Sequence, residues 1–256
     1  MKSRFVLGLR VDATCYGEAS RQIASWAELS LSRTVCCANV HMVMEANRDP
    51  SFRSSVNSAD LVTADGVPLV WALRGSGAEQ ATRVYGPDLM DAVLSLAAAF
   101  GTPVGFYGAT DTTLGRLSER TRRRHPGLNV VFSYAPPFRD LDGDEEEEVL
   151  RRIEISGTRI LFVGLGCPKQ ERWMARNRQR IRCVQLGVGA AFDQLAGTKP
   201  RAPAWMQAAG CEWLFRLAVE PRRLWRRYLW SNTAFLVRMM NAWIRTGSSI
   251  VREASS

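Results

Sequence analysis

The segment Arg159-Ile-Leu-Phe-Val-Gly-Leu-Gly-Cys-Pro168 joins a short apolar run to a glycine-rich turn and to a proline that suits the first turn of a helix. Comparable apolar runs recur along the chain with helical stretches between them, at residues 5–11, 34–39, 61–64, 103–107, 129–134 and 183–187. This alternation favours a largely parallel sheet flanked by helices, in which ligands bind at the carboxyl ends of the strands. The sequence therefore predicts an α/β, Rossmann-like fold with its sites in the loops that follow the strands.

The composition is that of an ordinary globular protein, with 256 residues, of which 46% are hydrophobic and 23% charged. The apolar run at the start is broken by Arg10 and Asp12, which favours the first strand of a cytosolic protein over a secretory signal. The six cysteines form no C-x-x-C pair, and with two histidines their spacing fits no metal site. We therefore expect reduced thiols and neither a disordered nor a membrane-embedded chain.

The C-terminal quarter differs from the rest of the chain. A linker-like segment, Gly197-Thr-Lys-Pro-Arg-Ala-Pro203, precedes a stretch rich in Trp and Arg. Residues 197–256 contain ten Lys or Arg against three Asp or Glu, so most of the formal charge of +9 lies there. From Arg222 onward apolar residues recur every three or four positions with arginines between them, which is the pattern of a basic amphipathic helix. We predict an α/β core over 1–196 and a basic helical appendage over 197–256.

Three kinds of partner fit such an appendage. Trp and Arg beside an apolar helix face suit the headgroup layer of an anionic membrane surface. The helix could instead cover the core or form a dimer contact, and Arg with aromatic residues also suits nucleic acid. The pattern favours the membrane surface first, packing second and nucleic acid third.

Polar side chains follow two of the predicted strands. Asp65 comes after the apolar run 59–64 and before Gly66, where the chain turns sharply into a predicted helix over 67–74. Its carboxylate is either the N-cap of that helix or a general base at the mouth of the sheet. Asn39 ends another predicted strand, and we expect it to be a hydrogen-bonding neighbour of Asp65 at a catalytic site.

Glycines mark further strand ends. Gly108 lies in a turn that would let backbone amides approach a diphosphate at a helix N-terminus, although many strand–helix turns look alike. The segment 164–171 is more informative, because two glycines and a proline are followed by donors for phosphate or sugar hydroxyls. Its candidate nucleotide-sugar ligands are Gly164, Gly166, Lys169 and Gln170.

Two charged residues are weaker candidates. Asp193 closes the segment 186–193 and is either a partner for a ribose or base edge or part of a packed turn. Arg83 is either a partner for phosphate or an isolated surface cation.

The acidic run Asp140-Leu-Asp142-Gly-Asp144 mimics the D-x-D element that holds a divalent ion on a nucleotide sugar. It continues directly into four glutamates, 145–148, and an amphipathic pattern. Acidic residues are favourable in the first turn of a helix. We therefore interpret the run as a helix start and expect neither a metal site nor a cofactor.

Several segments together resemble the WecG/TagA/CpsF glycosyltransferase family, also called glycosyltransferase family 26. In chain order they are Ala38–Ala46, Ala59–Gly66, Arg83–Gly86, Phe162–Glu171, Gly187–Asp193, Arg201–Pro203, Glu212–Arg216 and Glu220–Arg227. The resemblance covers nearly the whole chain, and the ordered combination is more specific than any single motif. The version Asn39-Val-His-Met42 looks closest to the exopolysaccharide-synthesis members.

The resemblance implies an inverting, metal-independent transfer from a UDP-sugar to an undecaprenyl-diphosphate-linked sugar, in the synthesis of teichoic acid linkers, enterobacterial antigen or exopolysaccharide. It implies that Asp65 is the base, that Asn39 lies near it, and that Arg83 and Gln170 lie on the phosphate side. It also implies an appendage that docks on the membrane and carries three arginines over the site, here Arg216, Arg223 and Arg227.

Other aspects of the activity stay open at the level of sequence. The resemblance leaves the donor sugar open among N-acetylmannosamine, its uronic acid and glucose. Cys37 stands where many relatives have a hydroxyl residue. The protein is expected in the cytoplasm, peripheral on the inner face of the bacterial plasma membrane. Hydrophobic surface beneath the appendage could support a homo-oligomer when the appendage is absent.

Two other classes of protein fit parts of the sequence. A nucleotide-dependent oxidoreductase is disfavoured because the first strand leads to Asp12-Ala-Thr-Cys-Tyr-Gly17 and not to G-x-G-x-x-G. A non-catalytic basic module that binds membrane or nucleic acid would not need the carboxylate of Asp65.

Overall fold

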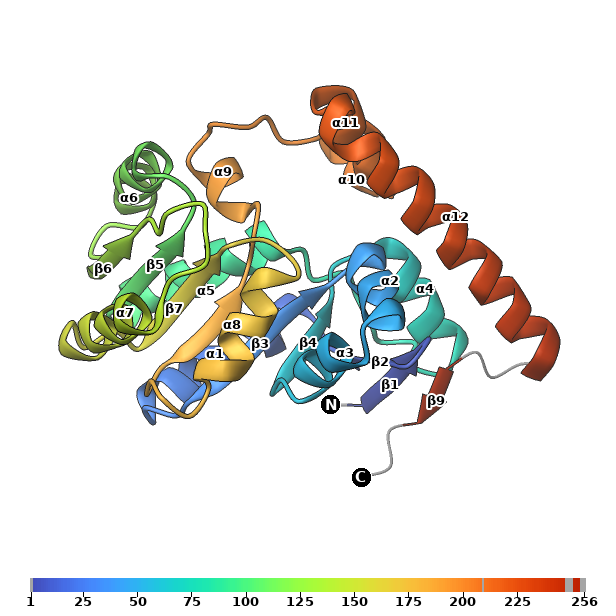
Figure 1. Ribbon diagram of the computed structural model, residues 1–256, viewed down its shortest axis with the longest axis horizontal. Helices are drawn as coiled ribbons and strands as arrows, with labels where there is room; N and C mark the ends of the chain where they lie inside the picture. Colours follow the sequence, from blue (N-terminus) through green and yellow to red (C-terminus); the bar gives the residue numbers. More distant parts are fainter. Residues whose placement is uncertain (1, 209, 247–250, 254–256) are drawn as a thin grey trace.

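The computed structural model describes residues 2–208, 210–246 and 251–253. These residues form one nine-stranded sheet in the order β6-β5-β7-β8-β3-β4-β2-β1-β9 (Figure 1). The strands are β1 Lys2–Val6, β2 Leu9–Ala13, β3 Arg33–Ala38, β4 Leu61–Ala64, β5 Val104–Gly108, β6 Val130–Tyr134, β7 Ile160–Gly164, β8 Val184–Gly187 and β9 Val251–Glu253.

Most of this sheet is parallel. Every pairing from β6 across to β2 is parallel, whereas β1 pairs antiparallel with both β2 and β9 at the edge. Parallel strands need long crossovers, which are here the helices that the sequence places between the apolar runs. The predicted α/β fold with a largely parallel sheet is therefore confirmed, and the carboxyl ends of β3, β4, β5, β7 and β8 share one edge.

The start of the chain differs from the prediction. The apolar run 5–11 forms parts of two antiparallel strands and not a single one, because the chain reverses at Leu7 and Gly8. Both residues have positive φ angles, 49° and 86°, as a two-residue hairpin turn of the favoured twist requires. Leu7 is an unusual turn residue, so composition gave no sign of the reversal.

Helices cover both faces of the sheet. On one face lie α2 (Val40–Arg48), α3 (Pro50–Asn57), α4 (Val67–Gly75), α7 (Gly143–Ile155) and α8 (Lys169–Asn177). On the other lie α1 (Tyr16–Glu28), α5 (Gly86–Phe100), α6 (Asp111–Arg124) and α9 (Ala191–Leu195). Each group packs its apolar side on the sheet, so two hydrophobic clusters stabilise the fold, one on each face.

The chain beyond α9 is helical, with α10 (Ala204–Ala208), α11 (Glu212–Val219) and the long α12 (Pro221–Thr246). The predicted helix from Arg222 onward is thus confirmed, while the division of the chain at residue 197 stays a prediction. We call α10, α11 and α12 the appendage. None of the helices in the described parts of the chain is long and apolar enough to cross a membrane.

The helix α12 runs along α2 at one end of the molecule (Figure 1). Phe235 is buried in this contact, the Arg48 guanidinium lies 3.2 Å from the centroid of the Trp230 ring, and Arg238 donates a 3.0 Å hydrogen bond to Asn47. One face of α12 therefore packs on the core, as the second of the three interpretations of the appendage expects.

Candidate active site

Asp65 and Asn39 follow neighbouring strands, β4 and β3, whose last residues Ala64 and Ala38 are paired in register. The Asp65 amide donates a 2.8 Å hydrogen bond to the Ala38 carbonyl, which ties the two strand ends together. The N-cap of α4 is Gly66, so the interpretation of Asp65 as that cap is wrong. The Asn39 carboxamide oxygen caps α2 by accepting a 3.2 Å bond from the Met42 amide.

The Asp65 carboxylate is half-buried and lies among charged groups. Burial, the largest cause, and the Glu212 carboxylate raise its pKa from the ordinary 3.8 to about 7, against the opposing effects of Arg83, Arg216 and a hydrogen bond from the Gly86 amide. A carboxyl group that titrates near neutral pH is well matched to accept a proton from a hydroxyl at that pH. The site therefore contains one group suited to general base catalysis.

A polar cavity of about 580 Å³ opens at the carboxyl ends of the parallel strands, within the range of roughly 300–1,000 Å³ usual for small-molecule sites. The structure brings together in its wall most of the predicted site residues. They are Asn39, Asp65, Gly164, Gly166, Gln170, Asp193 and Arg216. The prediction that the site lies at the strand ends agrees with this placement.

Gln170 and Lys169 are neighbours in α8 but point to different surroundings. Gln170 is buried in the cavity wall, where it accepts a 3.1 Å hydrogen bond from the Gly166 amide. Lys169 instead forms a 2.9 Å ion pair with Asp140. Successive residues of a helix project about 100° apart, so only one of the two can face the cavity.

Gly108 has a packing role that the sequence did not reveal. Its φ of 128° is disfavoured for other residues, and a Cβ atom there would lie 2.5 Å from the Gly164 carbonyl carbon. The following residues, Ala109 and Thr110, contribute to the cavity wall, and Thr110 caps α6. Gly108 therefore lets β5 and β7 approach closely beneath the predicted phosphate-binding turn.

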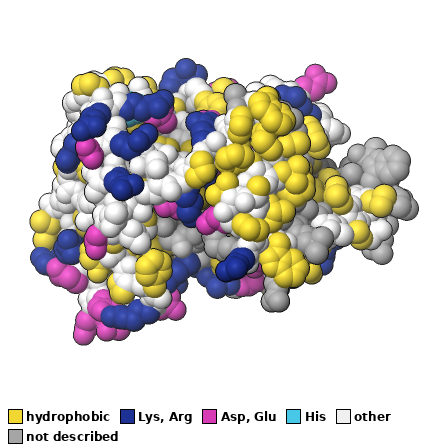
Figure 2. Space-filling model, turned by 90° about the horizontal axis from the view of Figure 1, so that it is seen from above, with side chains coloured by type: hydrophobic (Ala, Val, Ile, Leu, Met, Phe, Trp, Pro, Cys, Tyr) yellow, Lys and Arg dark blue, Asp and Glu magenta, His cyan; other side chains and the backbone are white. Residues whose placement is uncertain are grey.

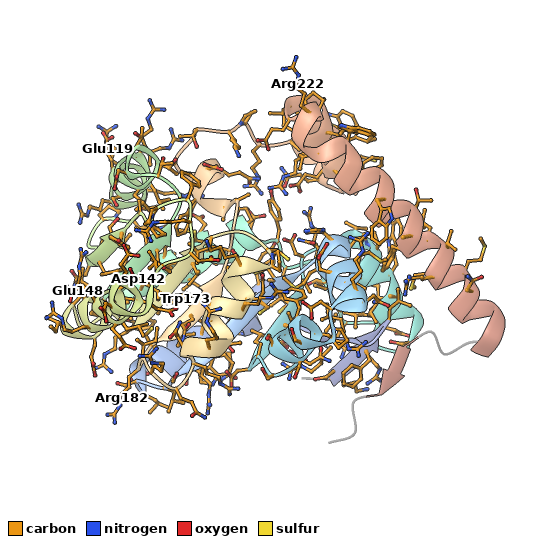
Figure 3. The ribbon with its side chains drawn as sticks, viewed as in Figure 1. Glu119, Asp142, Glu148, Trp173, Arg182 and Arg222 are labelled. Atoms are coloured by element: carbon orange, nitrogen blue, oxygen red, sulfur yellow. The ribbon has the colours of Figure 1, made fainter. Side chains whose placement is uncertain are left out.

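The acidic run belongs to a helix start. Asp142 is the N-cap of α7 and forms a capping box with Glu145. The interpretation as an acidic first helical turn is therefore confirmed. Figure 3 shows Asp142 at the end of the molecule opposite to α12.

An apolar cavity of about 360 Å³ lies on the other side of Asp65, between the core and the appendage. Its apolar wall includes Val67, Pro68 and Trp71 of α4, Trp213 of α11, and Phe235 and Leu236 of α12. Four residues line both this cavity and the polar one, namely Asn39, Asp65, Tyr85 and Arg216. The candidate base thus lies where a polar and an apolar cavity meet.

The remaining predicted residues are on the appendage side. Arg83 lines the apolar cavity and donates a 2.6 Å hydrogen bond to Glu212. Arg216 lines both cavities, whereas the side chains of Arg223 and Arg227 lie outside the described residues.

Sequence reasoning missed Tyr85, Glu212 and Lys199 as site residues. Lys199 lines the polar cavity and forms ion pairs with Asp193 at 2.9 Å and Glu220 at 3.2 Å. Lys199 stands in the linker-like segment 197–203, and Glu212 stands in a segment that carries the family resemblance. The charge of each side chain was the one signal in the sequence that could have marked it as a site residue.

Cys37 lies in the wall of the polar cavity at the end of β3. Burial raises the pKa of its thiol to about 12, so the thiol is neutral at physiological pH. Cys36 and Cys183 are likewise buried.

A parallel sheet with a polar cavity at its carboxyl edge, and a half-buried carboxylate in that cavity, defines an α/β protein that binds a ligand at the strand ends. The sequence model of the Glycosyl transferase WecG/TagA/CpsF family matches residues 4–249, and the chain belongs to this family. It is accordingly a glycosyltransferase of cell-surface polysaccharide synthesis. The family match thus decides against an oxidoreductase and against a non-catalytic basic module.

Proposed function

We propose that the protein transfers a sugar from a UDP-sugar to an undecaprenyl-diphosphate-linked sugar with inversion and without a metal ion. The observation that carries this proposal is the position of Asp65 between a polar and an apolar cavity. A transferase that joins a nucleotide sugar to a lipid-linked acceptor needs two such sites, with its base between them.

The polar cavity suits the donor. Its glycine-rich turns after β7 and β8 leave space for a diphosphate near backbone amides, and Gln170 and Asp193 offer partners for hydroxyl groups. Lys199 and Arg216 supply positive charge along the same wall. Charge that builds up on the departing UDP is stabilised by such preorganised donors and cations.

Asp65 supports an inverting reaction. Its carboxylate removes the proton of the acceptor hydroxyl, the acceptor oxygen forms a bond to the anomeric carbon, and the bond from that carbon to UDP breaks on the opposite face. A donor with an α linkage would then give a β-linked product. Asn39, next to Asp65, is placed to orient one of the reacting groups.

The apolar cavity suits the lipid part of the acceptor, and the surface around it suits a membrane. Figure 2 shows hydrophobic side chains gathered over the half of the molecule that holds the appendage. The exposed aromatic residues there are Trp71, Trp205, Trp213, Trp225 and Trp230. Large exposed apolar patches mark interaction sites, and Trp is favoured at the headgroup layer. These residues support peripheral contact with a membrane surface, and we propose that this surface is the inner face of the bacterial plasma membrane, as the family resemblance implies.

The test is acceptor-dependent UDP release by the purified protein with EDTA present, over a panel of UDP-sugars and a short-chain polyprenyl-diphosphate sugar. We expect release with one donor, and Asp65→Asn to lower turnover by roughly 10²–10⁴-fold while UDP affinity stays unchanged, because only the base is lost.

Asp144→Asn is the matched control, since it removes the same charge from the exposed start of α7 and should leave turnover unchanged. Near-full turnover of Asp65→Asn would contradict the mechanism. Loss of release in EDTA with recovery in magnesium would contradict the metal-independent reaction and revive the acidic run as a metal site.

A further inference from the structure

Glu212 is a buried carboxylate in an otherwise basic appendage. It is the first residue of α11, and only 9% of its side chain is exposed. Its oxygens lie 2.6 Å from Arg83 Nη2 and 3.7 Å from Arg216 Nε. A charged group is rarely buried unless it is paired, so the appendage places Glu212 in this position for its contact with arginine.

The contact determines how Arg83 is held. Arg83 Nε donates a 2.7 Å hydrogen bond to the Asp65 carbonyl oxygen, and the guanidinium lies 4.4 Å from the centroid of the Tyr85 ring. Arg83 Nη2 donates to Glu212 and stays 3.6 Å from Asp65 Oδ1, which is too long for a hydrogen bond. Glu212 therefore takes the guanidinium donor that would otherwise reach the Asp65 carboxylate.

We propose that Glu212 is a positioning residue that keeps Arg83 from forming a full ion pair with Asp65, so that the base is competent only when the appendage is docked. This inference rests on the proposed function, in which Asp65 is the base. A carboxylate that is hydrogen-bonded to arginine is a weaker base, since the positive charge stabilises its ionised form.

Several other titratable groups lie near Asp65. The titratable groups that influence Asp65 or share a cavity wall with it are Arg83 and Tyr85 before α5, Cys37 on β3, His41 on α2, Tyr16 at the start of α1, and Glu212 and Arg216 on α11. Among these, Glu212 is the one carboxylate, and it alone both opposes the ionisation of Asp65 and accepts from Arg83.

The arrangement couples the appendage to the chemistry. If α11 were absent, Arg83 would lose its partner Glu212 and would retain the Asp65 carboxylate at ion-pair distance, which would weaken the base. With α11 docked, Arg83 is oriented by Glu212 and Tyr85, and its Nη2 lies 3.6 Å from the Asp65 carboxylate without donating a hydrogen bond to it. Through its contact with Arg83, Glu212 thus makes the base strength of Asp65 depend on the docking of the appendage.

The test uses full-length protein labelled with ¹³C at the aspartate carboxyl carbons. The Asp65 signal is assigned by its absence from Asp65→Asn and is followed from pH 4 to pH 9 in wild type and in Glu212→Gln. We expect the midpoint to move at least one pH unit lower in Glu212→Gln, a tenfold lower proton affinity. The acidic limb of the kcat/KM profile for UDP release should move by the same amount, with donor KM unchanged.

Two further variants test whether Glu212 acts by positioning Arg83 or only by helping the appendage to dock. Glu212→Asp retains the charge and should keep the midpoint closer to that of wild type than Glu212→Gln does. Glu220→Gln removes a carboxylate from the end of α11 at its contact with Lys199 and should leave the midpoint in place.

An unchanged midpoint in Glu212→Gln, or an equal shift in Glu220→Gln, would overturn the proposal. A shifted midpoint in a protein that releases no UDP from any donor would leave the contact supported and refute the proposed function.

Discussion

The two sides of the active site are held in different ways. The strand-end side, with Asp65 and the glycine turns after β5 and β7, rests on a sheet whose central strands are almost wholly buried. The appendage side lies half-exposed over the cavities and is joined to the core through a limited apolar contact along α12. The preceding segment 197–203 adds ion pairs such as Lys199–Asp193 and Arg201–Asp88.

This difference suggests that the two sides fail differently. Apolar burial contributes most of the stability of a fold, whereas exposed ion pairs each contribute little, about 0–1 kcal/mol. Substitutions on the strand-end side should therefore lower the free energy of unfolding. Deletion of the appendage should instead abolish most of the turnover and leave the core folded. Three predictions test this contrast.

The largest expected effect is on activity when residues 197–256 are deleted. The deletion removes Arg216, Glu212 and Lys199 from the cavities, so we expect turnover to fall by at least about 100-fold, as when a preorganised charge-stabilising group is lost. Circular dichroism should still show a folded core with a cooperative thermal transition. Binding to anionic liposomes should be lost, with neutral liposomes as the control.

A core that unfolds on deletion would refute the contrast between the two sides. Liposome binding equal to that of the full-length protein would remove the appendage as the membrane contact.

The second prediction concerns the strand-end side. Gly108→Ala places a Cβ atom against the Gly164 backbone at a φ of 128°, so we expect a loss of about 2–4 kcal/mol in the free energy of unfolding, measured in urea.

Gly115→Ala is the matched control, because Gly115 lies inside α6 with open space around its Cβ position. Removing a helical glycine there should raise stability by about 0.5–1 kcal/mol. Equal stability of the two variants would contradict the prediction, because it would show that the end of β5 accommodates a Cβ atom at no greater cost than an exposed helix does.

The smallest effect is on the pH dependence of stability in Asp65→Asn. Because the folded protein raises the pKa of Asp65 from its ordinary 3.8 to about 7, the unfolded chain ionises first as pH rises. The wild type should therefore lose stability relative to Asp65→Asn between about pH 4 and pH 7, by about 1–2 kcal/mol after allowance for partial exposure.

The measurement is the difference in unfolding free energy between the two proteins at pH 5 and pH 8. We expect the stability advantage of Asp65→Asn over the wild type to be larger at pH 8. An advantage that is equal at both pH values, or larger at pH 5, would contradict the raised pKa.

Much of the fold was predictable because its strands are short apolar runs bounded by turn residues. The run 61–64 matches β4 at both ends, and the run 159–164 matches β7 to within one residue. The run 5–11 failed because its turn contains Leu7, whose side chain continues the apolar pattern while its backbone reverses the chain.

The roles of the candidate site residues stay predictions, but their proximity could be predicted. Asp65, Asn39, Gly164, Gly166, Gln170 and Asp193 lie together in the polar cavity because each stands at the end of a strand or in the turn or helix that follows it. Lys169 was placed in the same group because it adjoins Gln170 in sequence, yet the helical rotation between them turns it toward Asp140.

The sequence by itself determined the strand–helix alternation, the edge of the sheet that carries the site, the basic helix and the acidic start of α7. These features depend on residues that are close along the chain, through periodicity, turns and helix caps. Only the tertiary structure decided that two cavities meet at Asp65 and that Arg83 pairs with Glu212, 129 positions away. Such contacts arise from the packing of α11 against the strand ends, and no local pattern encodes that packing.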